Sequence, residues 1–420
     1  MLKIKINSNR KFLYIQKLFY CITAILLLAI NCIHAQETLS LVSAIDSALR
    51  NNLTLHNEKL RTEYSKALIP SGTSLPATSF TGELGQINSA YFDNGMGISQ
   101  TFLFPAVYKA QKQLLTQEWK ASVLNVGIKE WEIKKQITRI FVNYGYWKAK
   151  EQLLHKSDSL YVLLLSKAVL RLQKGESNRL ETTFFEAQKN AIALQLIQTR
   201  QELALTEAEF FVLTNTSKPY RPEWPSEVIT VLQPHLMPTQ DHPELRFAEQ
   251  LQETAKMATQ AEQSKLLPEI TLGYNNMSIK GTGANDKTYT GAHRFHAALI
   301  GLSVPIFTSA QKSKIKASQI NEVYLRNHLE LQQQVLNNSI KKASILYVQQ
   351  RERVELFSKQ YLQNAAAIKE TALKQFTNGE INYLEYVVLA NQAIAIESES
   401  IDALNLLQHS IIELNFPNIK

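Results

Sequence analysis

The chain contains one pattern written twice, and this repeat limits the folds that are open to it. Residues 170–188 have the sequence LRLQKGESNRLETTFFEAQ, and residues 373–392 have the sequence LKQFTNGEINYLEYVVLANQ. Four identical positions recur at a constant separation of 204 residues: Gly175 with Gly379, Glu176 with Glu380, Leu180 with Leu384, and Glu181 with Glu385. In each copy a glycine separates a very long helical pattern from a second one, which predicts a duplicated fold that turns at each glycine.

The sequences of the two repeats predict the same order of helices and strands. The first repeat, residues 36–215, predicts a short helix at 39–51, a helix at 53–68, a β-hairpin at 76–104, a long helix at 106–174 and a helix at 179–213. The second repeat, residues 241–420, predicts a helix at 243–267, a β-hairpin at 268–307, a long helix at 309–375 and a helix at 381–415. The proline-rich segment 216–240 predicts a linker between the repeats, with a short strand at 227–232.

The helices predict an extended architecture. The 106–174 stretch has no proline and only two glycines, and at 1.5 Å per residue it would be on the order of 100 Å long. A compact domain of this size cannot contain such a rod, so we expect a projecting coiled coil or the wall of a tube. Within 179–213, ten residues step by four and three: Leu180, Phe184, Ala187, Ala191, Leu194, Gln198, Gln201, Leu205, Ala208 and Val212. This seven-residue pattern indicates close antiparallel packing in a tube wall, or a plain antiparallel coiled coil.

The two hairpins predict strands that alternate between apolar and polar residues. Ile270, Leu272 and Tyr274 alternate with small or polar residues, as expected for lipid on one side and water on the other. Four strands cannot close a barrel, and open edges in lipid would leave backbone groups unpaired. We therefore expect several chains to pool their strands; the alternative is a soluble four-stranded sheet. The glycine-rich connection of the second hairpin, 12 residues longer than that of the first, predicts a solvent-exposed loop.

The first 35 residues predict a secretory signal peptide. They contain five basic residues, no acidic residue and the apolar run FYCITAILLLAI, which is too short to span a bilayer comfortably. We expect cleavage after Ala35 or Gln36. A retained membrane anchor and a lipidated Cys32 are the alternatives, although the asparagine before Cys32 fits a lipoprotein signal poorly. Both cysteines, Cys21 and Cys32, lie in this segment, so the mature chain has no thiol for a disulfide, a nucleophile or a metal.

The basic character of the chain belongs mostly to this leader. The full sequence has 45 Lys and Arg against 37 Asp and Glu, for a net charge of +8. Without the five basic residues of the leader, the net charge falls to +3. Net charge therefore gives little support to a nucleic-acid partner.

The paired motifs RLQKGESNRLETTFFEAQ and QFTNGEINYLEYVVLANQ resemble those of the TolC-type outer-membrane efflux family. The segments SAIDSALRNN and HPEL also fit, and the resemblance covers about residues 37–415. It implies a mainly α fold with a small transmembrane β part, assembled as a homotrimer: one twelve-stranded β-barrel in the outer membrane, continued by an α-helical barrel across the periplasm. It also implies docking to a periplasmic adaptor (membrane fusion) protein and an inner-membrane transporter. The family function is passive conduction of small molecules or metal ions, as the exit duct of a tripartite efflux or type I secretion system.

The resemblance places acidic residues at the narrow periplasmic end of the channel. Glu181 and Glu385 each follow the turn glycine by six residues, and Glu186 is a further candidate. A ring of carboxylates favours cations. The family can carry a second acid one turn later, where this sequence has Val388. The alternative for these glutamates is a structural role, as solvated charges near a helix N-terminus.

Other residues have expected structural roles at the tip and in the barrel. Gly175 and Gly379 suit a left-handed turn because they have no Cβ, and by resemblance these turns, with Glu176 and Glu380, form the tip that contacts the adaptor. Four aromatic residues are candidates for the girdles of the barrel: Phe80, Phe102, Phe104 and Tyr274. Ordinary strand composition is the alternative for these aromatics.

The sequence gives no sign of an enzyme or a cofactor site. His293 and His296 suggest a metal, but no third ligand lies near them, so we expect no metal site and no cofactor. No phosphate loop, nucleophile elbow or zinc-protease motif is present. The alternative to a channel is a periplasmic adaptor or a structural coiled-coil protein without a pore. An adaptor has one helical hairpin flanked by small β-domains, whereas this chain predicts two helical hairpins.

Overall fold

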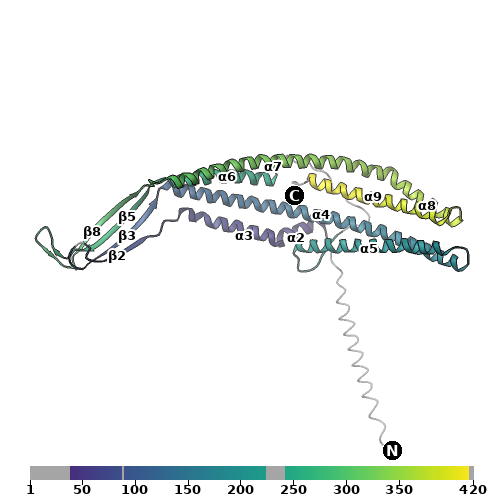
Figure 1. The fold of residues 1–420 in the computed structure, drawn as a ribbon, viewed down its shortest axis with the longest axis horizontal. Coiled ribbons are helices and arrows are strands. Elements are labelled where there is room, and N and C mark those ends of the chain that lie inside the picture. Colours follow the sequence, from purple (N-terminus) through teal and green to yellow (C-terminus); the bar gives the residue numbers. More distant parts are fainter. Residues whose placement is uncertain (1–37, 88, 224–241, 416–420) are drawn as a thin grey trace, which may run out of the picture. The chain divides into compact units, whose positions relative to one another are not determined.

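The computed structural model describes residues 38–87, 89–223 and 242–415. The described chain is mainly helical, and both halves run in the order helix, β-hairpin, long helix, glycine turn, helix (Figure 1). The predicted fold class, duplicated long helical hairpins with two β-hairpins, is therefore confirmed. The leader 1–35, both cysteines and the strand expected at 227–232 lie outside the described residues.

The helices and strands have the following bounds. The first half contains α2 (Leu41–Asn51), α3 (Leu53–Leu68), β2 (Ser79–Gly85), β3 (Asp93–Leu103), α4 (Pro105–Gln173) and α5 (Arg179–Thr214). The second half contains α6 (Pro243–Ser264), β5 (Glu269–Ser278), β8 (Arg294–Ser303), α7 (Ser309–Leu356), α8 (Leu362–Asn378) and α9 (Tyr383–Asn415). With 69 residues, α4 is roughly 100 Å long at 1.5 Å per residue.

The chain divides into two compact units, and each unit draws on both repeats. Within the described residues, the first, which we call the tip unit, comprises 38–51, 137–223 and 368–401 and contains both glycine turns. The other, which we call the sheet unit, comprises 52–87, 89–136, 242–367 and 402–415. Helices α4 and α9 contribute to both units. The repeat visible in the sequence is therefore not a unit that packs by itself.

The core of the tip unit joins the two helical hairpins. Its buried side chains come from all four helices: Tyr161, Leu164 and Ala168 of α4, Phe185, Ile192 and Leu196 of α5, Ala372 of α8, and Tyr386, Val387 and Ala390 of α9. The phenol of Tyr161 donates a hydrogen bond to Asn391 Oδ1 at 2.7 Å. Small alanines on α8 and α9 let the helices approach closely, while Phe185 packs among neighbouring rings such as Phe376, with centroids 6.4 Å apart.

Helix α5 carries two rows of residues, which we call stripes, on opposite sides of the helix. The inner stripe is buried within the chain and includes Phe185, Leu196, Leu203 and Phe210. At 100° per residue, the ten-residue pattern predicted from the sequence lies on the other side, and we call it the outer stripe. Leu194 is 57% exposed, Leu205 60% and Val212 70%. The predicted packing surface is thus present, but in the single chain its side chains are mostly exposed to solvent.

The second part of the tip unit fixes the start of the described chain. β1 (Thr38–Leu39) pairs in parallel with β4 (Arg221–Pro222), whereas within the linker 216–240 the sequence suggested a strand only at 227–232. Helix α2 packs against α5, and the side-chain amide of Asn215 donates to the carbonyl of Asn51 at 2.9 Å. This arrangement holds the first helix of the described chain to the end of α5.

The sheet unit contains a four-stranded antiparallel sheet in the order β2-β3-β5-β8. The inner strands β3 and β5 come from different repeats and pair from Gly95 with Met277 to Leu103 with Glu269. The edge strands, β2 and β8, have one partner each among the described residues. Figure 1 shows these strands extending away from the helices of the same unit.

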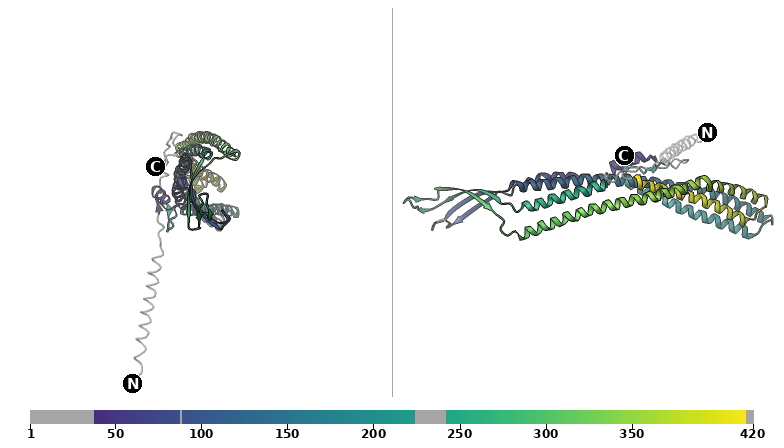
Figure 2. Two further views of the ribbon diagram at one scale, coloured as in Figure 1. Left: turned by 90° about the vertical axis from the view of Figure 1, so that its left-hand side faces the viewer. Right: turned by 90° about the horizontal axis from the view of Figure 1, so that it is seen from above.

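The helices of the sheet unit pack side by side through polar contacts as well as apolar ones. Helix α6 lies along α7 (Figures 1 and 2), where Gln311 donates to the carbonyl of Glu262 at 2.7 Å. On its other side Gln250 donates to Gln117 Oε1 of α4 at 2.9 Å. Gly72, after α3, lies so close to α4 that a Cβ there would come within 2.8 Å of the Lys112 nitrogen.

Two expectations need correction. The helix predicted at 309–375 is not uniform, because a π-helical turn at Phe357–Tyr361 separates α7 from α8. Such a turn inserts one extra residue, and the apolar periodicity read over a long stretch of sequence does not reveal a single insertion.

The connection of the second hairpin is also more ordered than predicted, because β6 (Gly281–Thr282) and β7 (Thr288–Tyr289) pair as a short two-stranded ribbon. Within the described residues, no helix is long and apolar enough to cross a membrane.

His242 links the start of α6 to α4 within the sheet unit. It is the N-cap of α6, and its Nδ1 accepts a hydrogen bond from the Glu244 N–H at 3.3 Å. Its ring lies edge-on to Trp131 with centroids 5.0 Å apart. Burial, and secondarily the charge of Lys135, lowers the pKa of His242 from 6.5 to about 4. The folded chain therefore holds this imidazole neutral.

The first prediction concerns pH. Because the folded pKa of His242 lies below the unfolded value, its stabilising contribution is complete above about pH 6.5 and is lost as the pH falls towards 4. At 1.36 kcal/mol per pKa unit, the free energy of unfolding should fall by up to about 3 kcal/mol. His242→Asn keeps a capping acceptor and should flatten the pH dependence of thermal unfolding between pH 4 and 6.5. The exposed His56→Asn should leave it unchanged; equal flattening in both variants would contradict the assignment.

Candidate functional site

The two glycine turns of the tip unit have the same geometry. Gly175 has φ +76° and Gly379 has φ +78°, as predicted for left-handed turns. Gly175 N–H donates to the carbonyl of Leu172 at 3.0 Å, and Glu176 N–H donates to that of Arg171 at 2.9 Å. The equivalent bonds in the second repeat measure 3.2 and 2.9 Å. Helices α4 and α8 therefore both end in a Schellman motif, which satisfies their last carbonyl groups.

The helices after the turns also begin in the same way. Asn178 caps α5 by accepting a hydrogen bond from Glu181 N–H at 3.0 Å. Asn382 caps α9 by accepting one from Glu385 N–H at 3.0 Å. The Asn-x-x-Glu spacing is a capping-box signature that the sequence carries twice. Glu181 and Glu385 are therefore third residues of capped helices, whatever further role they have.

The carboxylates of the two glutamates have different surroundings. Glu181 is only 4% exposed, and its Oε1 lies 3.1 Å from Arg171 Nη1. The hydroxyl of Ser177 donates to its other oxygen. The solvated charge that the structural alternative described is thus not found at Glu181. Arg171 offsets the charge of this carboxylate, and the Ser177 hydroxyl satisfies its other oxygen with a hydrogen bond.

Glu385 lies in solvent at the second turn. It is exposed, and its Oε2 accepts a hydrogen bond from Asn382 N–H at 2.9 Å, which completes a reciprocal capping box. Positions equivalent to Arg171 and Ser177 are Gln375 and Ile381, neither of which can supply a cation. The two tips therefore share a backbone but differ in charge: the first is an ion pair and the second an open carboxylate.

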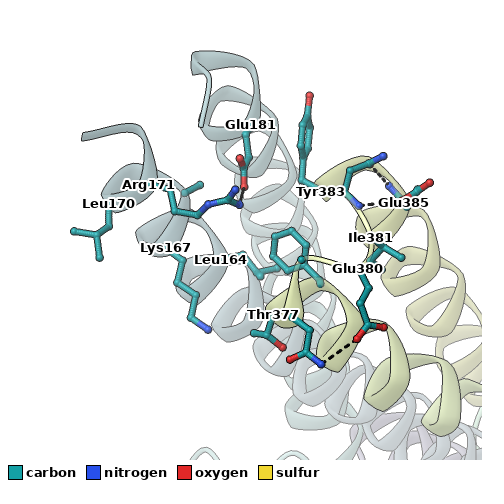
Figure 3. Close-up of a pocket in the computed structure, with 15 residues that line it drawn as sticks. Leu164, Lys167, Leu170, Arg171, Glu181, Thr377, Glu380, Ile381, Tyr383 and Glu385 are labelled. Carbon is teal, nitrogen blue, oxygen red and sulfur yellow. Dashed lines mark hydrogen bonds and ion pairs between the residues drawn. The ribbon is translucent and has the colours of Figure 1, made fainter. Parts of the chain in front are cut away.

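A groove lies between the end of α4 and the second glycine turn (Figure 3). Its volume is about 850 Å³. Lys167 and Arg171 line one side and Glu380 and Glu385 the other, with Tyr383 in the wall. Both signs of charge thus border a partly apolar hollow within the tip unit, a composition suited to binding a protein segment that carries charged and apolar groups.

The structure brings together only part of the predicted set of tip residues. Glu181, Glu385, Gly379 and Glu380 all border the groove. Glu186, Gly175 and Glu176 are exposed but do not line it. Sequence reasoning missed Arg171 and Ser177 as partners of Glu181, because nothing in the spacing marks a contact across the turn. It also missed the caps Asn178 and Asn382, which the capping-box spacing could have identified.

Three of the four aromatic candidates, Phe80, Phe102 and Tyr274, lie in strands and share one face of the sheet. Phe80 pairs with Ile98, which in turn pairs with Tyr274, so Phe80 and Tyr274 belong to one row. Phe102 lies in a row nearer the helices, and Phe104 follows the end of β3. Two rows at different heights agree with the girdle hypothesis, which stays a prediction.

In the described part of the chain, no group of three or more potential metal ligands occurs.

The second prediction tests the turns. Gly175→Ala and Gly379→Ala meet no atom within 4 Å, so their cost is conformational, about 1 kcal/mol each for a left-handed residue. Gly127→Ala is the control, because it lies within α4 and also has open space around it. There alanine should stabilise by roughly 0.5–1 kcal/mol. Denaturant unfolding followed by circular dichroism should show opposite shifts, and shifts of the same sign would contradict the turn assignment.

Comparison with known proteins is informative at the level of structure. No protein-family model matches the chain, and no curated protein matches it. Solved structures do match over 89% of the chain. They include CusC (TM-score 0.75, 16% identity, 91% of that chain) and a membrane protein from Pseudomonas aeruginosa (TM-score 0.76, 15% identity, 92% of that chain). The Campylobacter jejuni CmeC outer membrane channel matches with TM-score 0.73 and 14% identity over 84% of its length.

Because these matches cover 89% of the chain, they include parts of both repeats. At such low identity they establish architecture. The fold that the resemblance implies for a single chain is therefore confirmed: this chain has the fold of the TolC-type outer-membrane channels.

Proposed function

We propose that the protein is the outer-membrane exit duct of a tripartite efflux or type I secretion system. Three copies would combine their four-stranded sheets into a twelve-stranded barrel in the outer membrane. Their helices would form a tunnel that extends into the periplasm. The tunnel would conduct small molecules or metal ions passively from an inner-membrane transporter, through a periplasmic adaptor protein. No catalytic step and no cofactor belongs to this function.

The sheet is the observation that carries the proposal. On one face, Phe80 is 77% exposed, Ile300 81% and Leu302 67%. The opposite face carries small and polar residues such as Thr81, Ser99 and Asn275. A soluble sheet would cover its apolar face, whereas a barrel wall presents it to lipid and its polar face to a water-filled interior. The two edge strands supply the pairing groups for neighbouring copies.

The outer stripe of α5 supports assembly on the helical side. It is a heptad-like row of Leu, Ala and Gln on the side opposite the inner stripe, and most of it is exposed in the single chain. Alternating small and large residues at a seven-residue spacing pack closely against another helix. A neighbouring copy would supply that helix, and both stripes of α5 would then be buried.

The tips support a role in docking and in charge selection. The groove beside the second turn presents cationic and anionic groups together, which suits an adaptor with complementary charges. Glu385 is the best candidate for a cation-selective constriction because its carboxylate is open to solvent. Glu181 is a weaker candidate because Arg171 neutralises it, and Glu186 is exposed further along α5. The partner transporter would select the cargo.

The second candidate function is a periplasmic adaptor or structural coiled-coil protein. The structure has two helical hairpins in one unit and a four-stranded sheet with an exposed apolar face, and these features favour the channel over that alternative. Expression followed by membrane fractionation separates them directly. The channel predicts the outer-membrane fraction, whereas a soluble monomer in the periplasmic fraction would reject it.

The third prediction concerns assembly. Unheated gel electrophoresis of the purified protein should give a band near three chain masses that collapses on boiling. Leu194→Gln combined with Leu205→Gln should weaken this band, because both side chains belong to the outer stripe. Glu202→Gln, an exposed change on the flank of the same helix, should leave it intact. An unchanged band in the double variant would remove the outer stripe from the subunit interface.

The fourth prediction concerns ion selectivity. In planar bilayers under a salt gradient, Glu385→Gln should shift the reversal potential towards weaker cation preference. Glu181→Gln should have a smaller effect, because Arg171 already offsets that charge. Glu249→Gln, an exposed change on α6, is the control. If Glu385→Gln and Glu249→Gln give the same reversal potential as the unchanged protein, Glu385 does not line the constriction.

A further inference from the structure

The apolar face of the sheet ends in a polar patch at the end that carries the hairpin connections. Along β8, Leu302, Ile300 and Ala298 are followed on the same face by His296 and Arg294. The distance from Leu302 to His296 is about 20 Å at 3.4 Å per residue. Exposed Ile306 and Phe307 continue the apolar surface in the other direction. The polar patch thus lies about 20 Å along the strand from Leu302, comparable with the roughly 25 Å apolar band of a membrane barrel.

Arg294 is the centre of this patch. Its Nε donates to Asn276 Oδ1 on β5, and its Nη1 donates to Asn94 Oδ1 on β3. Its Nη2 donates to the carbonyl of Asn276 at 3.1 Å. A guanidinium has five N–H groups, so these three bonds fix its position and leave two donors for a ligand. The residue is anchored across three strands and is only partly buried.

His296 and Tyr274 extend the patch along the same face. The Tyr274 hydroxyl and His296 Nδ1 are 2.5 Å apart, and their rings stack with centroids 5.9 Å apart. This contact orients the ring and leaves Nε2 of the exposed His296 available. Tyrosine beside an apolar surface is typical of the boundary between hydrocarbon and headgroups.

The acidic residues of the sheet lie on the other face or are already hydrogen-bonded elsewhere. Glu83 and Glu269 have side chains on the opposite face, by the alternation of the strands. The Asp93 carboxylate lies nearer, beside Ser278, but it accepts hydrogen bonds from the Ser89 hydroxyl at 2.7 Å and the Lys280 N–H at 2.9 Å. Among the described residues, no acidic side chain forms an ion pair with Arg294. The 279–296 segment carries Lys280, Lys287 and Arg294 against a single Asp286. The Arg294 guanidinium thus lies at the edge of an apolar surface without a direct ion pair among the described residues.

We propose that Arg294, His296 and Tyr274 bind the anionic phosphate headgroup of an outer-leaflet lipid. The acyl chains would lie along the apolar face, and the phosphate would accept hydrogen bonds from the two remaining guanidinium donors and from the imidazole. An Arg fork matches the geometry of phosphate oxygens, and the bonds are charge-assisted. The inference rests on the proposed function, because the apolar face must lie in a bilayer for the lipid to reach the patch.

The test is native mass spectrometry of the detergent-solubilised protein with added lipid. The probes are phosphatidylglycerol and phosphatidylcholine with the same acyl chains, with inorganic phosphate as competitor. The unchanged protein should retain phosphatidylglycerol in preference to phosphatidylcholine, and millimolar inorganic phosphate should not displace it. Arg294→Gln should lower the apparent affinity for phosphatidylglycerol about tenfold, the loss expected for a charge-assisted contact. Arg351→Gln makes the same charge change on α7 and should leave the affinity unchanged.

A second variant separates binding from folding, because Arg294 also braces three strands. His296→Gln leaves the bonds of Arg294 to Asn94 and Asn276 in place, and it should lower the affinity by a smaller factor. Equal retention of the two lipids overturns the proposal, as does an equal loss in Arg294→Gln and Arg351→Gln. Displacement by inorganic phosphate would identify a free-anion site and would also overturn it.

Measurements on the same protein preparation distinguish a failure of the lipid-site proposal from a failure of the proposed channel function. Conductance and the heat-sensitive high-mass band are measured in parallel on each variant. A protein that conducts but shows no lipid preference leaves the channel intact and rejects only the lipid site. A protein that neither conducts nor enters membranes rejects the channel, and the lipid site with it.

Discussion

The sheet has unpaired edges and an uncovered apolar face, and the rest of the structure depends on how these are satisfied. Its two edge strands have one partner each among the described residues, and its apolar face is exposed. Unpaired backbone and uncovered apolar surface are both costly, the first in lipid and the second in water. Lipid against the apolar face and further copies at the edges satisfy both requirements together. The outer stripe of α5 presents the same need for a neighbour on the helical side.

Duplication gives two similar tips, but local contacts give them different properties. Both turns use a left-handed glycine, a Schellman motif and an asparagine cap. Differences at only two aligned positions, Arg171 with Gln375 and Ser177 with Ile381, change the surroundings of the following glutamate. One carboxylate is buried in an ion pair and the other is solvated. A backbone that is fixed by capping can thus vary its charge without changing shape.

The two compact units show how long helices distribute stability. Helix α4 contributes both to the aromatic core between the hairpins and to the contacts of the sheet unit. A helix of this length is stabilised by neighbours along its whole extent and not by propensity alone. Because each unit draws on both repeats, neither repeat can be removed without opening both cores. The His242–Trp131 contact ties the start of the second repeat to the long helix of the first.

The sequence by itself determined the order of elements, the glycine turns and the alternation of the strands. These features follow from local rules: proline and glycine end helices, left-handed turns need glycine, and strand faces alternate with period two. Only the tertiary structure decided which stripe of α5 is buried, that Arg171 pairs with Glu181, and that a π-turn interrupts the second long helix. The patch around Arg294 is also a tertiary result, because Asn94, Asn276 and Arg294 are far apart in the chain. Local periodicity marks a face as apolar, but the approach of distant segments decides what covers it.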